Sequence, residues 1–169
     1  GALAHEVTEE HDRHQALRAA IAAAPIETLA SNPALQRAAI EGGHAAFKVN
    51  CVQCHGSGAA GGIGYPNLKD EDWLWGGSIN DIHTTLQHGI RAADDPATRS
   101  SLMPSFGKDG ILTADQVSDT AAYVLSLSGK HTKDAAAQRG AANFAANCVA
   151  CHGPDAKGSR QFGAPNLTD

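Results

Sequence analysis

An all-α fold is predicted for this 169-residue chain by three features of its sequence. Apolar residues recur at the spacing of one helix face in several segments. Typical signals for helix starts and helix ends flank these segments. The motif Cys-x-x-Cys-His occurs twice, within two longer stretches that match each other. The length is enough for one ordinary domain or for two very small ones.

Two helices are predicted in residues 1–42, which we expect to form an N-terminal helical segment. Thr8 is the expected cap of the first helix, and Pro25 interrupts that helix. Asn32 followed by Pro33 is a typical start of the second helix, because proline at the first helical position loses no hydrogen bond. The second helix is expected to extend towards the first cysteine motif.

An internal repeat starts at Gly43 and again at Gly140, which lies 97 positions later. Each copy contains the pattern Gly-x-x-x-Phe-x-x-Asn-Cys-Val-x-Cys-His-Gly. A Pro-Asn-Leu triplet follows each copy, at Pro66 and at Pro165, and the intervening gap is two residues longer in the second copy. The sequence therefore indicates that one module has been duplicated.

The segment after the first motif combines a loop and a helix. Residues 56–64 are rich in glycine and predict a flexible loop; a phosphate-binding loop would need a following Gly-Lys-Ser/Thr, which is missing. Trp73 and Trp75 are expected to pack in a core or against the edge of a bound group, rather than to form a docking patch. The next helix is expected to begin after Ser78 with these residues facing inwards: Ile79, Ile82, Leu86 and Ile90.

A helix over residues 113–128 is predicted to close the first module. It starts with a capping box at Thr113 and carries an apolar stripe. Gly43 and Phe47 lie one helical turn apart, so a second helix could approach closely at this face. We expect Tyr123 to contact both of them.

The two cysteine motifs are the attachment signature of c-type haem. Their residues are Cys51, Cys54 and His55 in the first copy, and Cys148, Cys151 and His152 in the second. The two thiols would bond to the porphyrin vinyl groups, and the histidine would ligate the iron. A zinc site would need a second ligand pair at finger spacing, and a thioredoxin-like pair would need a βαβ frame; neither is evident. We therefore expect two haem c groups, which would also supplement a core in which only 5% of the residues are aromatic.

His55 is the predicted proximal ligand of the first iron, and the carbonyl of Pro66 is the candidate acceptor for its other ring nitrogen. Met103 is the predicted distal ligand, although a lone methionine is ordinarily a core residue. It is the only methionine, and it lies in a predicted loop directly before Pro104. A thioether ligand favours ferrous iron, and a filled sixth position leaves no place for substrate. Electron transfer is therefore favoured over catalysis.

The second site is incomplete in this sequence. His152 is its predicted proximal ligand, but no second methionine and no closing helix follow. We expect one complete haem domain over residues 43–130 and the truncated start of another over residues 131–169. Another group filling the distal position, or an open position, stays an alternative. The remaining histidines are expected to be structural or surface residues: His5, His11, His14, His44, His83, His88 and His131.

Several longer stretches carry a resemblance to a known family. They are Gly64-Tyr65-Pro66-Asn67-Leu68, Asp72-Trp73-Leu74-Trp75-Gly76-Gly77, His88-Gly89-Ile90-Arg91, Met103-Pro104-Ser105-Phe106-Gly107 and Tyr123-Val124-Leu125-Ser126-Leu127-Ser128-Gly129. Together they resemble the dihaem cytochrome c subunit of cbb3-type cytochrome c oxidases. The second motif, with residues 163–169, resembles the start of that subunit's second haem domain.

This resemblance implies two cytochrome c folds with His/Met ligation of both irons, and delivery of electrons to an oxygen-reducing haem–copper core. The implied partners are the catalytic subunit, the monohaem cytochrome subunit and a small soluble cytochrome c as donor. The formal net charge of −5 favours a basic partner surface and disfavours nucleic acid. The implied location is the periplasmic side of the bacterial inner membrane, with an anchor that precedes this chain. The chain starts at glycine and has no apolar run long enough to cross a membrane, so we expect a processed or excised fragment.

Two other functions stay open at this point. The chain could be a carrier for a periplasmic dehydrogenase, and a membrane segment encoded upstream would instead favour the oxidase subunit. It could also be a gas sensor or peroxidase with an open second iron. Carbon monoxide binding to the reduced full-length protein would test that last function. The chain has none of the copper or high-spin haem site of an oxidase, so we do not expect it to reduce oxygen by itself.

Overall fold

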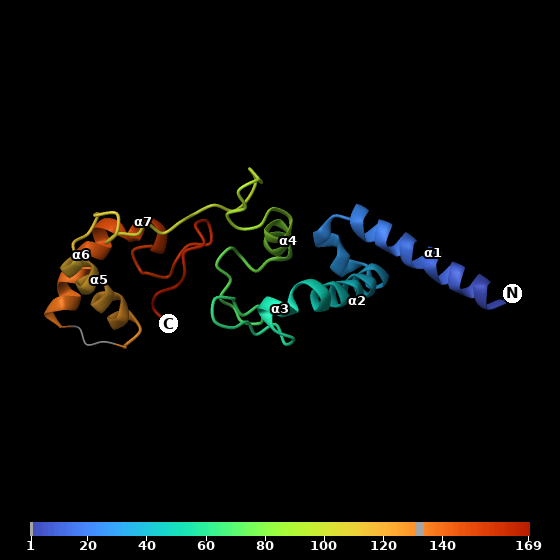
Figure 1. Ribbon diagram of the computed structural model, residues 1–169, viewed down its shortest axis with the longest axis horizontal. Coiled ribbons are helices and arrows are strands. Elements are labelled where there is room, and N and C mark those ends of the chain that lie inside the picture. The colour runs from blue at the N-terminus through green and yellow to red at the C-terminus, as the bar shows by residue number, and fades with distance from the viewer. Residues whose placement is uncertain (1, 131–133) are drawn as a thin grey trace. The chain divides into compact units, whose positions relative to one another are not determined.

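The computed structural model describes residues 2–130 and 134–169, and its regular secondary structure there is helical (Figure 1). The helices are α1 Ala2–Ala23, the 3-10 helix η1 Ile26–Ser31, α2 Pro33–Asn50, α3 Val52–His55, α4 Ile79–His88, α5 Ala114–Leu127, α6 Ala135–Asn147 and α7 Val149–His152. No strand occurs in the described residues, where extended pairing is limited to isolated bridges. The predicted all-α class is confirmed for this part of the chain.

The described chain divides into two compact units. The first unit comprises the residues up to Glu71 together with Ser78–Asn80, and the second comprises Asp72–Gly77 and the described residues of Asp81–Asp169. The domain boundaries expected from the sequence, at residues 43 and 131, stay a prediction. His131 itself lies outside the described residues.

In the first unit, α2 contacts both α1 and η1. Helix α1 ends at Ala23, before Pro25 as predicted, but it begins at Ala2. Thr8 is therefore an interior helix residue and not a cap, which corrects the sequence-based prediction. A threonine inside a helix costs only a fraction of a kcal/mol, roughly 0.7 at most relative to alanine, so good helix formers before it extend the helix past it.

The start of α2 is the one that the sequence predicts. The side chain of Asn32 accepts a hydrogen bond from the backbone N–H of Leu35 at 3.2 Å, and Pro33 occupies the first helical position. At its other end, the N–H of Cys51 donates to the carbonyl of Phe47 at 2.9 Å. Helix α2 thus leads directly into the first cysteine motif.

The core of the second unit is the packing of α5 against α6, with α7 following α6 (Figure 1). Phe144 on α6 is only 2% exposed, and its ring centroid lies 5.3 Å from that of Tyr123 on α5. A Cβ atom added at Gly140 would overlap the carbonyl oxygen of Asp119 and lie 2.9 Å from the Cβ of Tyr123. Only glycine at position 140 allows this close approach.

Within the second unit, Tyr123 packs against Phe144 and Gly140, which correspond in the repeat to Phe47 and Gly43. The expected contact of Tyr123 with Gly43 and Phe47, which belong to the first unit, stays a prediction. A Cβ added at Gly43 would have no other atom within 4 Å. Both copies of the repeat present the same Gly-x-x-x-Phe face, so the sequence pattern does not determine which copy receives α5.

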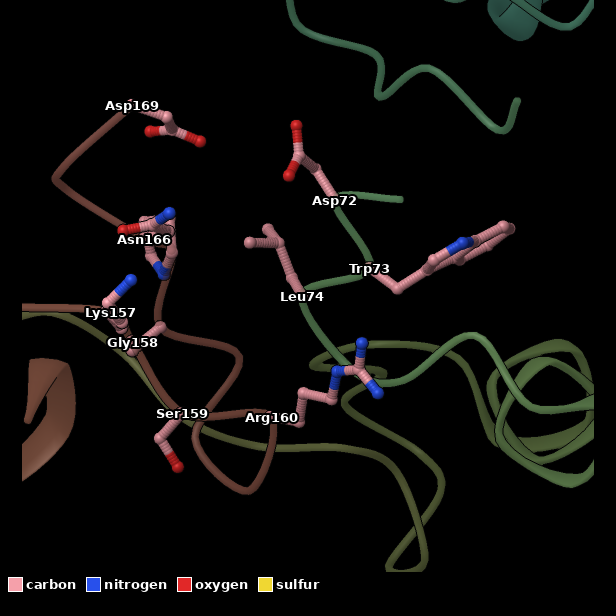
Figure 2. Close-up of a pocket in the computed structure, with 11 residues that line it drawn as sticks. Asp72, Trp73, Leu74, Lys157, Gly158, Ser159, Arg160, Asn166 and Asp169 are labelled. Carbon is pink, nitrogen blue, oxygen red and sulfur yellow. The ribbon is translucent and has the colours of Figure 1, made fainter. Parts of the chain in front are cut away.

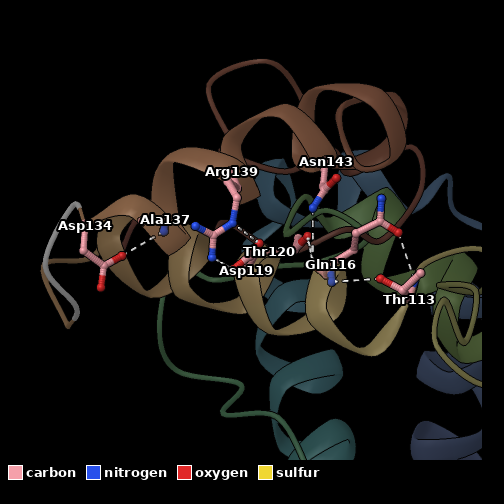
Figure 3. Close-up of polar contacts among 8 residues, drawn as sticks. All are labelled: Thr113, Gln116, Asp119, Thr120, Asp134, Ala137, Arg139 and Asn143. Carbon is pink, nitrogen blue, oxygen red and sulfur yellow. Dashed lines mark hydrogen bonds and ion pairs between the residues drawn. The ribbon is translucent and has the colours of Figure 1, made fainter.

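The ends of the paired helices are capped by their own side chains (Figure 3). Thr113 accepts from the N–H of Gln116 at 3.2 Å, and the side chain of Gln116 accepts from the N–H of Thr113 at 2.9 Å. The predicted capping box is therefore confirmed. At the start of α6, Asp134 accepts from the N–H of Ala137 at 2.9 Å.

An ion pair connects the two helices. The guanidinium of Arg139 on α6 donates two hydrogen bonds of 2.7 Å to the carboxylate of Asp119 on α5 (Figure 3). This carboxylate raises the pKa of Arg139, chiefly through the side-chain hydrogen bond. Asn143 adds a bond of 3.3 Å to the carbonyl of Gln116. Polar contacts on one side of the pair thus complement the aromatic contact in the core.

Helix α4 starts at Ile79, directly after Ser78, as predicted. The expectation that its apolar residues face inwards is wrong for Leu86, which is 75% exposed, and also for Ile79. Ile90, predicted on the same helix, lies after its end at His88, forms an isolated bridge with Arg99 and is also exposed. The apolar stripe of an amphipathic helix predicts which face is apolar, but it does not predict what covers that face. None of the helices in residues 2–130 and 134–169 is both long and apolar enough to cross a membrane.

Candidate functional site

Both cysteine motifs form the same short helix at the end of a longer one. In the first copy, the N–H of His55 donates to the carbonyl of Cys51 at 2.9 Å. In the second copy, the N–H of His152 donates to the carbonyl of Cys148, also at 2.9 Å. Helical spacing places the first cysteine, the second cysteine and the histidine of each motif on one face. A planar group could therefore be held by all three side chains at once.

The four cysteines are free. Cys54 and Cys151, the second cysteines of the two motifs, are exposed, whereas Cys51 is half-buried and Cys148 is buried. Burial raises the pKa of the Cys148 thiol, with a further contribution from the nearby Cys151. Each motif thus offers two free thiols, which is what attachment to vinyl groups requires.

Each motif histidine is oriented by a main-chain carbonyl. The Nδ1 atom of His55 lies 3.0 Å from the carbonyl oxygen of Pro66, and that of His152 lies 3.1 Å from the carbonyl oxygen of Pro165. Because a carbonyl can only accept, Nδ1 carries the hydrogen and donates in both cases. The lone pair of Nε2 is then available to a metal. The acceptor predicted for His55 is confirmed, and the repeat has an equivalent acceptor for His152.

A glycine in each loop makes room for the acceptor carbonyl. The backbone N–H groups of Gly61 and Gly158 donate to the carbonyl of the preceding motif histidine, both at 2.8 Å. A Cβ atom added at Gly61 would lie 2.6 Å from the carbonyl oxygen of Pro66, and one at Gly158 would lie 2.7 Å from that of Pro165. Both glycines also have a positive φ, of +70° and +81°. The loop and the histidine orientation therefore depend on each other.

The two extra residues of the second copy lie at the tip of a small hairpin. In the first copy, Gly62 and Tyr65 form an antiparallel bridge that encloses Ile63 and Gly64. In the second copy, the equivalent bridge joins Ser159 to Ala164 and encloses residues 160–163. The longer tip leaves the orientation of the acceptor carbonyl unchanged, since the two histidine distances differ by only 0.1 Å.

Tyr65 is a site residue that the sequence analysis did not single out. Its ring meets the ring of His55 edge to face, at 6.1 Å between centroids and 70° between planes. The neighbouring Cys54 side chain raises the pKa of Tyr65. The signal that could have revealed it is a difference within the repeat, because the equivalent position in the second copy is Ala164.

Met103 lies in the second unit, in the irregular segment between α4 and α5, and its side chain is 67% exposed. Its role as the distal ligand of the first iron stays a prediction.

The start of this segment is held by Arg91, which donates to the carbonyl of Ser101 at 3.1 Å. Near the end of α4, the Nδ1 atom of His88 lies 2.9 Å from the carboxylate of Asp95, whose pKa is lowered mainly by that hydrogen bond.

Arg99 holds together the segment between α4 and α5. It donates to the hydroxyl of Thr85 at 2.9 Å and to the carbonyl of Asp81 at 3.1 Å. Its guanidinium carbon lies 5.8 Å from the ring centroid of Trp75, at the distance of a cation–π contact. The indole of Trp75 also covers Gly163, where an added Cβ would overlap the ring. Trp75 therefore packs inside the second unit.

A pocket of about 530 Å³ in the second unit lies beside the loop that orients His152 (Figure 2). One wall is Asp72, Trp73 and Leu74, and the opposite wall comes from the loop after α7. Figure 2 shows Leu74 pointing towards Asn166, whereas the ring of Trp73 points away. Lysine, arginine and aspartate side chains line this pocket together, so it does not select for ligands of one charge.

Comparison with known proteins finds two kinds of match. A family model described as Cytochrome c matches residues 40–128 and 137–169, which include both cysteine motifs. The curated relatives include the cbb3-type cytochrome c oxidase subunit CcoP of Cereibacter sphaeroides, 55% identical over 85% of this chain and 50% of the relative. Subunit FixP of Rhizobium meliloti is 53% identical over 88% of this chain and 51% of the relative. Subunit CcoP of Azospirillum brasilense is 43% identical over 98% of this chain and 58% of the relative. The chain thus spans about half the length of the curated relatives that it matches.

Proposed function

The chain belongs to the cytochrome c family and binds haem c, and we propose that it relays electrons as part of a cbb3-type cytochrome c oxidase subunit. The observation that carries this proposal is the shared geometry of the two motifs. In each of them, the Nδ1–H of the histidine is donated to a backbone carbonyl, and Nε2 is left free for iron. Two equivalent centres in one short chain are suited to passing an electron along.

The residues of both motifs fit a covalently attached haem. Two free thiols and one oriented imidazole share a helix face in each copy. We assign the first haem to Cys51, Cys54 and the proximal ligand His55, and the second to Cys148, Cys151 and the proximal ligand His152. When bound, the haem supplies reversible one-electron chemistry at its iron.

Met103 is the proposed distal ligand of the first iron. It lies in an irregular segment, and its thioether is mostly exposed and thus accessible. Bound to the iron, the thioether of Met103 would raise the reduction potential relative to a second imidazole, and it would exclude external ligands. Such a centre would exchange electrons and would not bind substrate.

The relatives' names support a place in the oxidase complex. The proposed partners are the catalytic subunit, the monohaem cytochrome subunit and a small soluble cytochrome c as the electron donor. The formal net charge of −5 suits a donor with a basic surface. The proposed location is the periplasmic side of the bacterial inner membrane, with a membrane anchor contributed by sequence outside this chain.

Affinity purification of the tagged full-length protein from membranes tests this function. We expect the oxidase subunits to co-purify, and oxygen consumption with reduced soluble cytochrome c to require an intact first motif. The matched control is the same complex with Cys54 retained and the exposed residue Ile63 changed to alanine, which should keep full activity. Isolation without any oxidase subunit, together with reduction by a dehydrogenase, would instead make the protein a dehydrogenase carrier.

A further inference from the structure

One aromatic side chain outside the first motif contacts the histidine of that motif. The rings of Tyr65 and His55 lie edge to face, at 6.1 Å between centroids and 70° between planes. His55 is the assigned proximal ligand of the first iron. The contact is therefore made with the ligand itself.

The backbone holds this side chain in place. The N–H of Tyr65 donates to the carbonyl of Gly62 at 2.9 Å, and the N–H of Gly62 donates back at 3.0 Å. The next residue, Pro66, carries the carbonyl that accepts from His55. The same hairpin thus positions the tyrosine ring and the acceptor carbonyl, and both of them contact His55.

The second motif has this backbone without this side chain. The N–H of Ala164 donates to the carbonyl of Ser159 at 3.0 Å, and the N–H of Ser159 donates back at 3.0 Å. Pro165 follows and accepts from His152 at 3.1 Å. Among these equivalent contacts, the aromatic ring at position 65 is what the second copy lacks.

We propose that Tyr65 is a positioning residue that makes the first haem electronically different from the second. The inference rests on the proposed attachment of haem at both motifs. The ring contact restricts rotation of the His55 imidazole, and the orientation of an imidazole that would ligate the iron influences the electronic structure of that iron.

Reciprocal substitutions in the full-length holoprotein test this proposal. Tyr65→Ala removes the ring, Tyr65→Phe keeps the ring as the matched control, and Ala164→Tyr adds a ring to the second copy. Ala164 is among the residues that line the pocket of about 530 Å³, so there is open space beside that position. The readouts are the two steps of a spectroelectrochemical titration and the low-spin ferric signals in electron paramagnetic resonance.

Tyr65→Ala should move one of the two titration steps, by about three- to tenfold in the ferric–ferrous equilibrium, where tenfold is 59 mV for one electron. It should also shift one ferric signal, because the imidazole is no longer restricted. Tyr65→Phe keeps the ring and should match the parent protein in both readouts. Ala164→Tyr should move the other step. Ile63→Ala, at the fully exposed tip of the same hairpin, should change neither step.

The proposal is overturned if the titration steps and ferric signals of Tyr65→Ala equal those of the parent protein, or if Tyr65→Phe shifts them as far as Tyr65→Ala does. It is also overturned if the Tyr65 and Ala164 variants move the same step. Haem content per chain separates this result from failure of the proposed function. A parent protein without covalent haem at the first motif would contradict the proposed function itself, whereas full haem content with unmoved steps would contradict only the role of Tyr65.

Discussion

At the scale of single residues, the histidines of the two motifs are controlled by main-chain groups. Pro66 and Pro165 contribute carbonyls, and Gly61 and Gly158 make room for them. The acceptor for His55 could be predicted from sequence, because a proline carbonyl near a haem motif has few other partners within the loop. Tyr65 could not be predicted, since its contact with His55 depends on the hairpin that brings the ring back over the motif.

Gly61→Ala should weaken the first site. The added Cβ would lie 2.6 Å from the carbonyl oxygen of Pro66, at a φ of +70° that alanine rarely adopts, so the acceptor must move away from His55. We expect a loss of about 1–3 kcal/mol in the free energy of unfolding, measured by urea titration of the holoprotein. Gly58→Ala is the matched control, because a Cβ there meets no atom within 4 Å. Equal stability of the two variants would contradict the close fit at Gly61.

Met103→Ala should change the first iron only. Without the thioether, ferric iron is favoured, and the ferric–ferrous equilibrium should shift by about tenfold or more, which is 59 mV for one electron. The open sixth position should also bind carbon monoxide in the reduced protein. A redox titration and a carbon monoxide difference spectrum measure both effects. An unchanged potential and spectrum would remove Met103 from the site.

At the scale of helices, local signals predicted where helices begin better than what they pack against. The starts at Asn32 and Thr113 were predictable because a cap is made by neighbouring residues in the chain. The partner of α5 was not predictable, because Phe47 and Phe144 occupy equivalent faces in the two copies. The exposure of Leu86 was not predictable for a similar reason, because apolar periodicity defines one face of a helix and does not show what packs against that face.

Substituting equivalent glycines of the repeat tests the pairing of α5 with α6. Gly140→Ala should destabilise the protein by roughly 2–4 kcal/mol, because the new Cβ overlaps the backbone of Asp119. Gly43→Ala should be neutral or stabilising by up to about 1 kcal/mol, because its Cβ would meet nothing and alanine favours a helix. Urea unfolding of both variants gives the comparison. The opposite order would mean that α5 packs against α2 in solution.

At the scale of the whole molecule, the chain holds two equivalent attachment sites joined to helices with different neighbours. Phe144, Cys148 and Ala156 form a buried cluster in the second unit, whereas no residue of α2 or α3 is buried. The duplication was evident from sequence, because two identical motifs are a local pattern. This difference in burial was not evident, since it depends on which copy packs against α5.

Loss of one attachment site should leave the other intact. Cys51→Ala with Cys54→Ala should remove one covalent haem per chain, which mass spectrometry of the full-length protein measures directly. Cys151→Ala with Cys148→Ala should remove the other, and it should also lower stability because Cys148 lies in the buried cluster. Retention of two haems in the first double variant would contradict the assignment of the first site.

The hairpin after each motif tolerates different lengths at its tip. Its closing pair is Gly62 with Tyr65 in one copy and Ser159 with Ala164 in the other, yet the imidazole donor distances are 3.0 and 3.1 Å. The accepting carbonyl belongs to the residue that directly follows the closing pair. Residues added between the two members of that pair therefore do not displace this carbonyl. For protein engineers, the turn at Ile63 is consequently a suitable graft point. A recognition peptide or an electrode-binding tag inserted there would project into solvent while the metal-binding ring kept its tautomer.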